Sequence, residues 1–153
     1  MRRSFQEATA KEAERIAVET KNTGTSIVTG APWVVDGSLF NAALVISGGA
    51  IQQVCLKSKL PNYGVFDEKR LFKKGAPSKL ISINVVKIGI LLCEDIWTSK
   101  PSYFMAQEGA EILVVINGSP FDVDKVASRQ CIPVETGVRT SWSKAVKWIN
   151  RKR

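Results

Sequence analysis

The sequence predicts an α/β fold, and three stretches of the chain carry that prediction. Residues 86–116 contain an apolar stretch, a stretch with helix signals and a second apolar stretch, which is the order of a parallel β–α–β crossover. Residues 26–57 contain three strand-like stretches separated by tight turns, and residues 4–21 have the spacing of a surface helix. Mixed strands with helices on the sheet faces are therefore the expected architecture.

The first half of the chain is predicted to hold one helix and a three-stranded meander. In residues 4–21 one helix face collects most of the apolar side chains, namely Phe5, Ala8, Ala13, Ile16 and Ala17. The Asn-Thr-Gly stretch at 22–24 ends this helix. Strands are then expected at 26–35, 38–46 and 50–57, with Asp36-Gly37 and Ser47-Gly48-Gly49 as the turns between them.

A long connection follows at 58–78, and it is predicted to be an ordered loop. Pro61 and Pro77 exclude a continuous helix or a central strand there. Loops of this length are usually either functional or disordered. Several large apolar side chains favour an ordered loop that packs against something, namely Leu60, Tyr63, Phe66 and Phe72.

The second half of the chain is predicted to hold the crossover. A strand, a turn and a buried strand are expected at 80–93, followed by a helix that Ser99 caps and Gly109 ends. A further buried strand is expected at 110–117. Cys93 then falls at the carboxyl end of the first crossover strand, where open α/β sheets place their ligands.

Composition excludes several classes of protein. A chain of 153 residues with 44% hydrophobic residues suits one folded domain. No apolar run approaches the roughly 20 residues of a membrane span, and the N-terminus lacks the apolar segment of a signal peptide, so a cytoplasmic protein without membrane contact is expected. The three cysteines lie far apart and the chain has no histidine, which excludes a zinc motif, a disulfide framework and histidine-assisted catalysis within this chain. No metal site is expected.

The formal charge of +8 favours an anionic partner, but the charge is concentrated at the two ends. Eight of the 22 Lys and Arg residues lie in residues 1–3 and 138–153, and the other 14 equal the 14 acidic residues. Residues 138–153 thus form a basic tail that also carries Trp142 and Trp148. Such a tail can stack on bases and contact phosphates, although a solvated tail is the favoured interpretation.

Taken alone, Cys93 is best explained as a small buried residue at a strand end. Three stretches in order change that interpretation: KSKLPNYGVFDEKRLF at 57–72, GILLCEDIW at 89–97 and GAEILVVINGSPF at 109–121. With GAPW at 30–33 and LFNAALVISGG at 39–49, they resemble the carbon–nitrogen hydrolase (nitrilase) superfamily, and within it the glutaminase domain of glutamine-dependent NAD synthetases. The resemblance implies a nitrilase-like α-β-β-α sandwich, incomplete at both ends of this chain.

The resemblance also implies amide hydrolysis by a Glu-Lys-Cys triad, of which Lys57 and Cys93 are present. Lys57 opens the Lys-x-x-Leu-Pro motif. A Cys93 thiolate would attack the side-chain amide of glutamine, release ammonia and leave a thioester for water to hydrolyse. The Lys57 ammonium would favour the thiolate and stabilise the oxyanion, with the backbone N–H after Cys93 as a second donor. Lys57 and Cys93 are therefore expected to converge.

A glutamine pocket is implied by the same family. Tyr63, Phe66 and Glu68 match the loop that lines it, with Glu68 facing the substrate ammonium, and Ser119 and Lys125 match the segment that holds the substrate carboxylate. The ordinary alternatives are loop packing for the two aromatic residues and surface charges for Lys57 and Glu68.

Three parts of the family pattern find no match in this sequence, and one of them is the set of further strands that would follow residue 125. The triad glutamate belongs upstream of residue 1, and no internal acid replaces it. The ATP-dependent synthetase domain, which would bind ATP and deamido-NAD, also has no counterpart, so no cofactor is expected in this chain. The sequence predicts a partial carbon–nitrogen hydrolase domain at 1–137, a basic tail at 138–153, and a fragment whose glutaminase activity for NAD biosynthesis is impaired.

Two other functions stay open from the sequence. One is a nitrilase-family amidase that acts on another amide, although the stretch LPNYGVFDE at 60–68 favours the synthetase branch. The other is a non-catalytic remnant whose basic tail binds nucleic acid. The partners expected from the resemblance are glutamine and either a second copy of the chain or a separate synthetase chain.

Overall fold

A computed structural model of the chain describes residues 1–64 and 66–118. The chain divides into two compact units, Met1–Ala76 and Pro77–Arg153. Within the described ranges, no helix combines the length and the apolar character that a membrane crossing requires.

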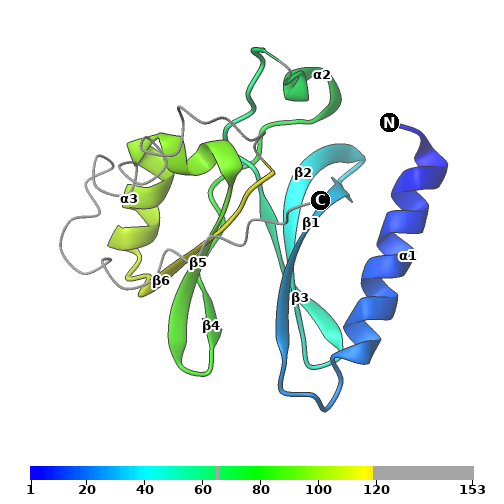
Figure 1. Cartoon of the computed structure of the whole chain (residues 1–153), viewed down its shortest axis with the longest axis vertical. Coiled ribbons are helices and arrows are strands. Elements are labelled where there is room, and N and C mark those ends of the chain that lie inside the picture. The colour runs from blue at the N-terminus through cyan, green and yellow to red at the C-terminus, as the bar shows by residue number, and fades with distance from the viewer. Residues whose placement is uncertain (65, 119–153) are drawn as a thin grey trace. The chain divides into compact units, whose positions relative to one another are not determined.

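The first unit is a long helix packed on an antiparallel sheet (Figure 1). Its elements are α1 (Arg3–Glu19), β1 (Ser26–Val35), β2 (Ser38–Ser47), β3 (Ala50–Leu56) and the short α2 (Glu68–Leu71). Strand β2 lies in the centre and pairs with both neighbours, as the meander prediction requires. The helix and the three strands expected from the sequence are confirmed, with ends that differ by at most two residues.

The core of this unit lies between α1 and β2. Ala13 and Ala17 of the helix are buried against Leu44 and Ile46 of the central strand. Phe5 lines one groove together with Ala8, Ala13 and Ile16, so the shared helix face expected from the sequence is confirmed, although Phe5 itself is 54% exposed. Opposite the first turns of α1, strand β1 presents small residues such as Gly30 and Ala31, which leave a groove beside Phe5 instead of covering it.

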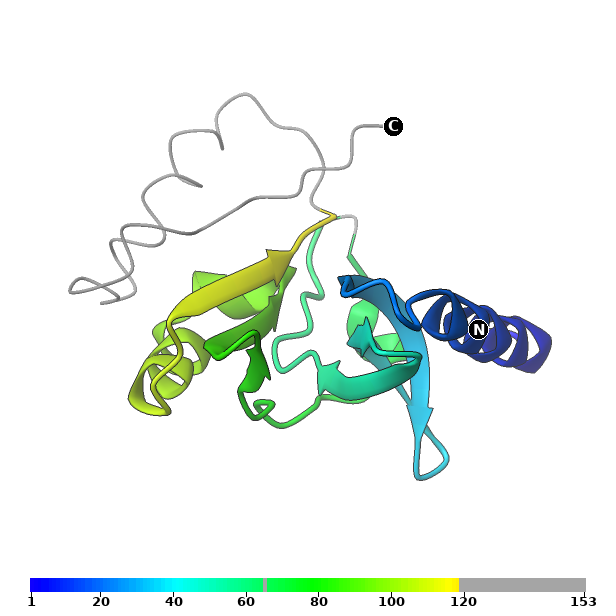
Figure 2. The ribbon, with the colours of Figure 1, turned by 90° about the horizontal axis from the view of Figure 1, so that it is seen from below.

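The second unit is built on a mixed sheet in the order β4-β5-β6. Its elements are β4 (Ile81–Ile83), β5 (Val86–Leu92), the 3-10 helix η1 (Cys93–Trp97), α3 (Ser99–Gln107) and β6 (Ile112–Ile116). Strands β4 and β5 are antiparallel, whereas β5 and β6 are parallel, with Ile88 opposite Ile112 and Leu92 opposite Ile116. Helix α3 packs against β5 and η1 (Figure 2). The predicted crossover is therefore confirmed.

The start of α3 corrects one prediction. Ser99 is the first residue of the helix, while Thr98 occupies the N-cap position and makes no side-chain capping bond. The helix η1 is not foreseen from the sequence, and the chain passes from η1 into α3 through the extended residue Thr98. The predicted stop is confirmed, because the helix ends at Gln107 and Gly109 adopts a φ of 86°.

Two hairpin turns, one in each unit, have similar positive φ values at both turn residues. The turn between β1 and β2 has φ values of 47° at Asp36 and 70° at Gly37. The turn between β4 and β5 has 48° at Asn84 and 65° at Val85. Two-residue turns with both φ values positive favour Asn-Gly or Asp-Gly. Val85 is therefore a strained residue, and it is also 94% exposed.

Replacing Val85 with glycine is expected to raise the free energy of unfolding by about 1 kcal/mol. A left-handed conformation costs an L-residue about 1–2 kcal/mol, and the greater flexibility of glycine in the unfolded chain offsets part of that gain. Urea unfolding measures the change. The reciprocal variant Gly37→Val is the matched control and should lose a similar amount. A Val85→Gly variant no more stable than the parent would contradict the strain at this turn.

Candidate active site

Lys57 is held at three points directly after the end of β3. Its backbone N–H donates to the carbonyl of Asn41 at 2.9 Å, and its own carbonyl accepts the N–H of Gly75 at 2.8 Å. Its side chain is 2% exposed, and Nζ donates to Oε1 of Glu68 at 2.6 Å. A buried ammonium is tolerated only with a partner of opposite charge. Lys57 is thus a fixed, buried cation and not a solvated charge at a strand end.

Glu68 supplies the partner of this cation from the start of α2. Its backbone N–H donates to the carbonyl of Pro61 at 3.2 Å, which ties α2 to the beginning of the loop. Within the described part of the chain, the second carboxylate oxygen, Oε2, is buried and has no hydrogen-bond partner. From the sequence, Glu68 is expected to face the substrate ammonium, and the structure places its other oxygen on Lys57. The substrate contact itself stays a prediction.

The two predicted aromatic residues of the loop contact each other. Tyr63 and Phe66 meet edge to face, with ring centroids 6.0 Å apart and an interplanar angle of 72°. The N–H of Phe66 also donates to the carbonyl of Tyr63 at 3.0 Å. Phe66 is half-buried, whereas Tyr63 is 58% exposed and presents much of its surface to solvent. The two aromatic residues therefore pack on each other, with much of Tyr63 accessible from outside.

Cys93 begins η1 directly after the buried strand β5. Its φ is 45°, so a residue with a side chain adopts the left-handed conformation there. The preceding residues Ile90, Leu91 and Leu92 are buried, while Cys93 itself is half-buried. Strained backbone of this kind costs about 1–3 kcal/mol and persists only where the surroundings enforce it. An ordinary core cysteine at a strand end has no need of this conformation.

Asp95 closes the turn that contains Cys93. Its side chain is 2% exposed, and Oδ2 accepts the backbone N–H of Leu92 at 3.2 Å. Hydrogen bonds to an ionised carboxylate are stronger than neutral ones. The carboxylate thus joins the residues before and after Cys93. This role is not foreseen from the sequence, and the signal that could have revealed it is an acid two positions after the cysteine at the end of an apolar strand.

The predicted site residues lie in two different units of the chain. Lys57, Tyr63, Phe66 and Glu68 belong to the first unit, and Cys93 belongs to the second, so the expected convergence of Lys57 and Cys93 stays a prediction. Ser119, Lys125 and the basic tail at 138–153 lie outside the described residues. In the part of the chain that is described, no cluster of three or more Cys, Asp or Glu side chains could hold a metal ion.

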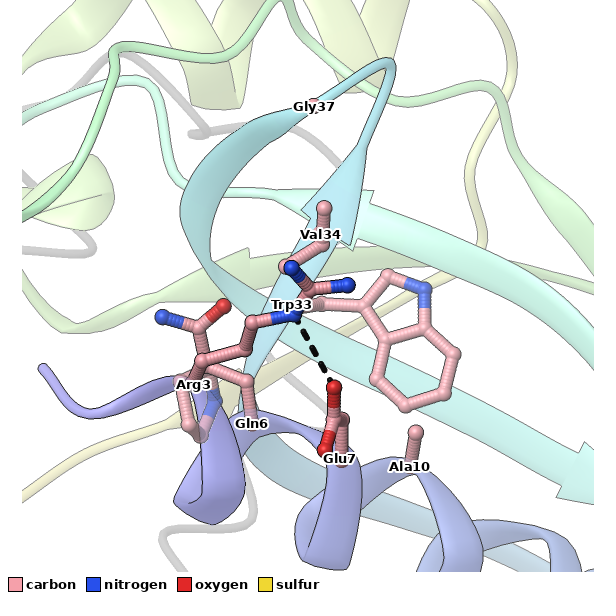
Figure 3. Close-up of a pocket in the computed structure, with 8 residues that line it drawn as sticks. Arg3, Gln6, Glu7, Ala10, Trp33, Val34 and Gly37 are labelled. Carbon is pink, nitrogen blue, oxygen red and sulfur yellow. Dashed lines mark hydrogen bonds and ion pairs between the residues drawn. The ribbon is translucent and has the colours of Figure 1, made fainter.

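The first unit also contains a hollow. It has a volume of about 520 Å³ between α1 and the β1–β2 hairpin (Figure 3). Its lining residues are Arg3, Gln6, Glu7, Ala10, Pro32, Trp33, Val34 and Gly37. Arg3 donates to Glu7 at 3.0 Å in its wall. Among the described residues of this unit, Lys57, Tyr63, Phe66 and Glu68 do not line the hollow.

Relatives of the chain are glutamine-dependent NAD(+) synthetases. The one from Thermotoga maritima is 36% identical over 132 residues, which are 85% of this chain and 23% of that protein. The one from Xanthomonas campestris is 36% identical over 123 residues, which are 79% of this chain and 22% of that protein. This chain therefore spans about a quarter of the length of these relatives.

Solved structures confirm the fold class. The glutamine-dependent NAD+ synthetase from Acinetobacter baumannii, in complex with ADP, matches with a TM-score of 0.80 and 32% identity over 88% of this chain and 25% of its own. An amidase from Nesterenkonia sp. matches with a TM-score of 0.73 over 88% of this chain and 52% of its own, at 21% identity, which shows the fold alone. The predicted nitrilase-like α/β fold is thus confirmed.

The family match covers both units. The family model described as carbon-nitrogen hydrolase matches residues 2–148, which include Lys57, Glu68 and Cys93 and continue past the boundary expected at 137. The motifs that carry the sequence resemblance, the fold of the solved structures and the matched family model all agree. The chain belongs to the carbon–nitrogen hydrolase family.

Proposed function

We propose that this chain hydrolyses the side-chain amide of glutamine, with Cys93 as nucleophile and Lys57 as its cationic partner. The observation that carries the proposal is the left-handed backbone of Cys93 at the carboxyl end of β5. Strained residues of this kind gather at active sites, and ligands of α/β sheets lie at the carboxyl ends of the strands. Glutamine is the proposed substrate because the relatives are glutamine-dependent NAD(+) synthetases.

The proposed reaction has two steps. The thiolate Sγ of Cys93 attacks the amide carbon of glutamine, the carbon–nitrogen bond breaks, and ammonia leaves with a proton taken up from the site. A thioester between Cys93 and the glutamyl group remains. Water then breaks the carbon–sulfur bond and releases glutamate. The ammonia would serve the amidation of deamido-NAD.

Lys57 is proposed to stabilise the negative charge that develops on sulfur and on the amide oxygen. A cation whose position is fixed before the reaction is worth more than a mobile one, because no reorganisation is needed as the charge develops. The contact with Glu68 at 2.6 Å supports that role, since it fixes Nζ without solvent. The buried Oε2 of Glu68, which has no hydrogen-bond partner among the described residues, supports a contact with the substrate ammonium. Substrate contacts by Tyr63, Phe66, Ser119 and Lys125 belong to the same proposal.

The wider setting of the reaction is also proposed. ATP and deamido-NAD are assigned to the synthetase part of the relatives, which this chain does not match, and no cofactor is assigned to the chain itself. A second copy of the chain or a separate synthetase chain is the proposed macromolecular partner. A cytoplasmic location, as expected from the sequence, is proposed together with glutamine hydrolysis.

Selective alkylation tests the proposal. With limiting iodoacetamide and peptide mass spectrometry, Cys93 should react about tenfold more slowly in a Lys57→Met variant, which corresponds to the loss of roughly 1.4 kcal/mol of charge stabilisation. Cys55 is fully buried and serves as an internal control, because its labelling would reveal unfolding. Equal Cys93 rates in the two proteins, with Cys55 protected in both, would contradict the role of Lys57.

Substrate protection tests the choice of amide. Saturating glutamine should slow the labelling of Cys93, whereas asparagine, which is one methylene shorter, should protect less. Protection by simple aliphatic amides but not by glutamine would favour the amidase alternative. Absence of protection by any amide would contradict amide hydrolysis at Cys93.

A further inference from the structure

We infer that Gly75 is a positioning residue for Lys57, an inference that rests on the proposed function of that lysine. The return segment, defined here as residues 68–75, contacts Lys57 at both of its ends. Its first residue, Glu68, binds the side-chain Nζ at 2.6 Å. Its last residue, Gly75, donates its N–H to the Lys57 carbonyl at 2.8 Å. One short segment thus holds the backbone and the ammonium of the same residue.

The return segment is anchored to the sheet between these two ends. The N–H of Lys73 donates to the carbonyl of Leu39 in β2 at 2.8 Å. Gly75 is buried, although Lys73, Lys74 and Ala76 around it are exposed. The segment therefore lies against the ends of β2 and β3 by backbone contacts, and the burial of Gly75 marks its point of closest approach.

Only glycine fits at that point. A Cβ added at position 75 would lie 2.3 Å from the Cβ of Leu56 and 3.1 Å from its carbonyl carbon. Non-bonded carbon atoms prefer about 3.5–4.0 Å. The obstructing atoms are a Cβ and the backbone of β3, which no side-chain rotation can move away. A larger residue must therefore push the return segment off the sheet.

The displacement would act on Lys57 from both sides. Moving position 75 outward lengthens the hydrogen bond to the Lys57 carbonyl, and the same segment carries Glu68. The requirement for glycine here is not one of backbone conformation, because the φ of Gly75 is not positive. The requirement comes from the close approach, and it is specific to Leu56.

The test compares Gly75→Ala with the double variant Leu56→Gly/Gly75→Ala, with Lys74→Ala as an exposed neighbouring control. The first readout is acetylation of Lys57 by an amine-reactive ester, quantified by peptide mass spectrometry. In the parent, Lys57 should be protected relative to Lys74. Gly75→Ala should raise Lys57 labelling about tenfold, the effect of losing a typical hydrogen bond on local opening. The double variant should recover at least part of the protection, and Lys74→Ala should match the parent.

The second readout is the alkylation rate of Cys93, measured beside Lys57→Met. If Cys93 is alkylated more slowly in Gly75→Ala and at the parent rate in the double variant, the positioning role is supported. If Cys93 is alkylated more slowly in Lys57→Met but not in Gly75→Ala, the positioning role of Gly75 is overturned and the proposed function stands. A Cys93 rate that Lys57→Met does not change rejects the proposed function, and Lys57 acetylation then decides the inference alone. If Gly75→Ala does not fold, amide exchange of the parent decides: an N–H of Gly75 no better protected than that of Lys74 overturns the inference.

Discussion

Replacing Lys57 with methionine is expected to lower the free energy of unfolding by about 3–5 kcal/mol. The ammonium is 2% exposed and its partner Glu68 is 16% exposed, so the variant leaves a carboxylate with little solvent and no cation at 2.6 Å. Removing one partner of a buried ion pair has a cost of this size, because the remaining charge stays desolvated. Whole domains have only about 5–15 kcal/mol of net stability, so this variant should be near the limit of folding.

The matched variants separate the ion pair from the burial of the lysine side chain. Glu68→Leu alone leaves the buried ammonium unpaired and should destabilise by a similar amount. The double variant Lys57→Met/Glu68→Leu should recover most of the loss, because two apolar side chains of suitable size can replace a buried pair at little cost. Urea unfolding of the four proteins gives the coupling free energy directly.

Catalysis should respond differently from stability in this set. The double variant recovers folding but has no cation, so glutamine hydrolysis should stay about 10²–10³-fold below the parent, the usual effect of losing one donor to a developing oxyanion. A double variant that regained both stability and the parent rate of ammonia release would show that Lys57 is structural only. Single variants as stable as the parent would contradict the buried pair.

The sequence pattern is sufficient to predict those helices, strands and turns that depend on neighbouring residues along the chain. The meander between Ser26 and Leu56 follows from alternating strands and from Gly-containing turns, whose chemistry is local. The parallel pairing of β5 and β6 follows from two continuous apolar stretches joined by a helix. The position of Cys93 at a strand end follows from the length of the apolar stretch before it.

What the sequence could not predict depends on contacts between residues that are distant along the chain. Lys57 and Glu68 are separated by a loop whose path no periodicity describes, so their ion pair is not foreseen and Glu68 is assigned to the substrate alone. The close approach of Gly75 to Leu56 is equally invisible in a sequence, because a loop glycine is as typical of a turn or of a flexible connection as of tight packing. The strain at Val85 is not foreseen because valine is not a residue type that predicts a positive φ.

Replacing Cys93 separates chemistry from strain, and the two expected effects have opposite signs. Either Cys93→Ala or Cys93→Gly removes the nucleophile, so ammonia release from glutamine should fall by about 10⁴-fold or more, as in other hydrolases that lose their nucleophile. The glycine variant should nevertheless be more stable than the alanine variant by about 1 kcal/mol. Alanine retains the Cβ that makes a φ of 45° unfavourable, whereas glycine does not.

The comparison between Cys93→Gly and Cys93→Ala is the informative one, because both variants lose the same sulfur and its packing. Urea unfolding of the two proteins measures the difference, and ammonia release from glutamine measures the loss of function. Equal stability would show that the left-handed conformation costs nothing, and the observation that carries the proposed function would lose its force. Unchanged ammonia release from Cys93→Ala would remove Cys93 as nucleophile. A Cys93→Gly variant that is more stable than Cys93→Ala, with hydrolysis lost in both, would have the opposite meaning. The fold, through the hydrogen bond from the Leu92 N–H to Asp95, would then hold a reactive cysteine in a backbone conformation that lowers stability.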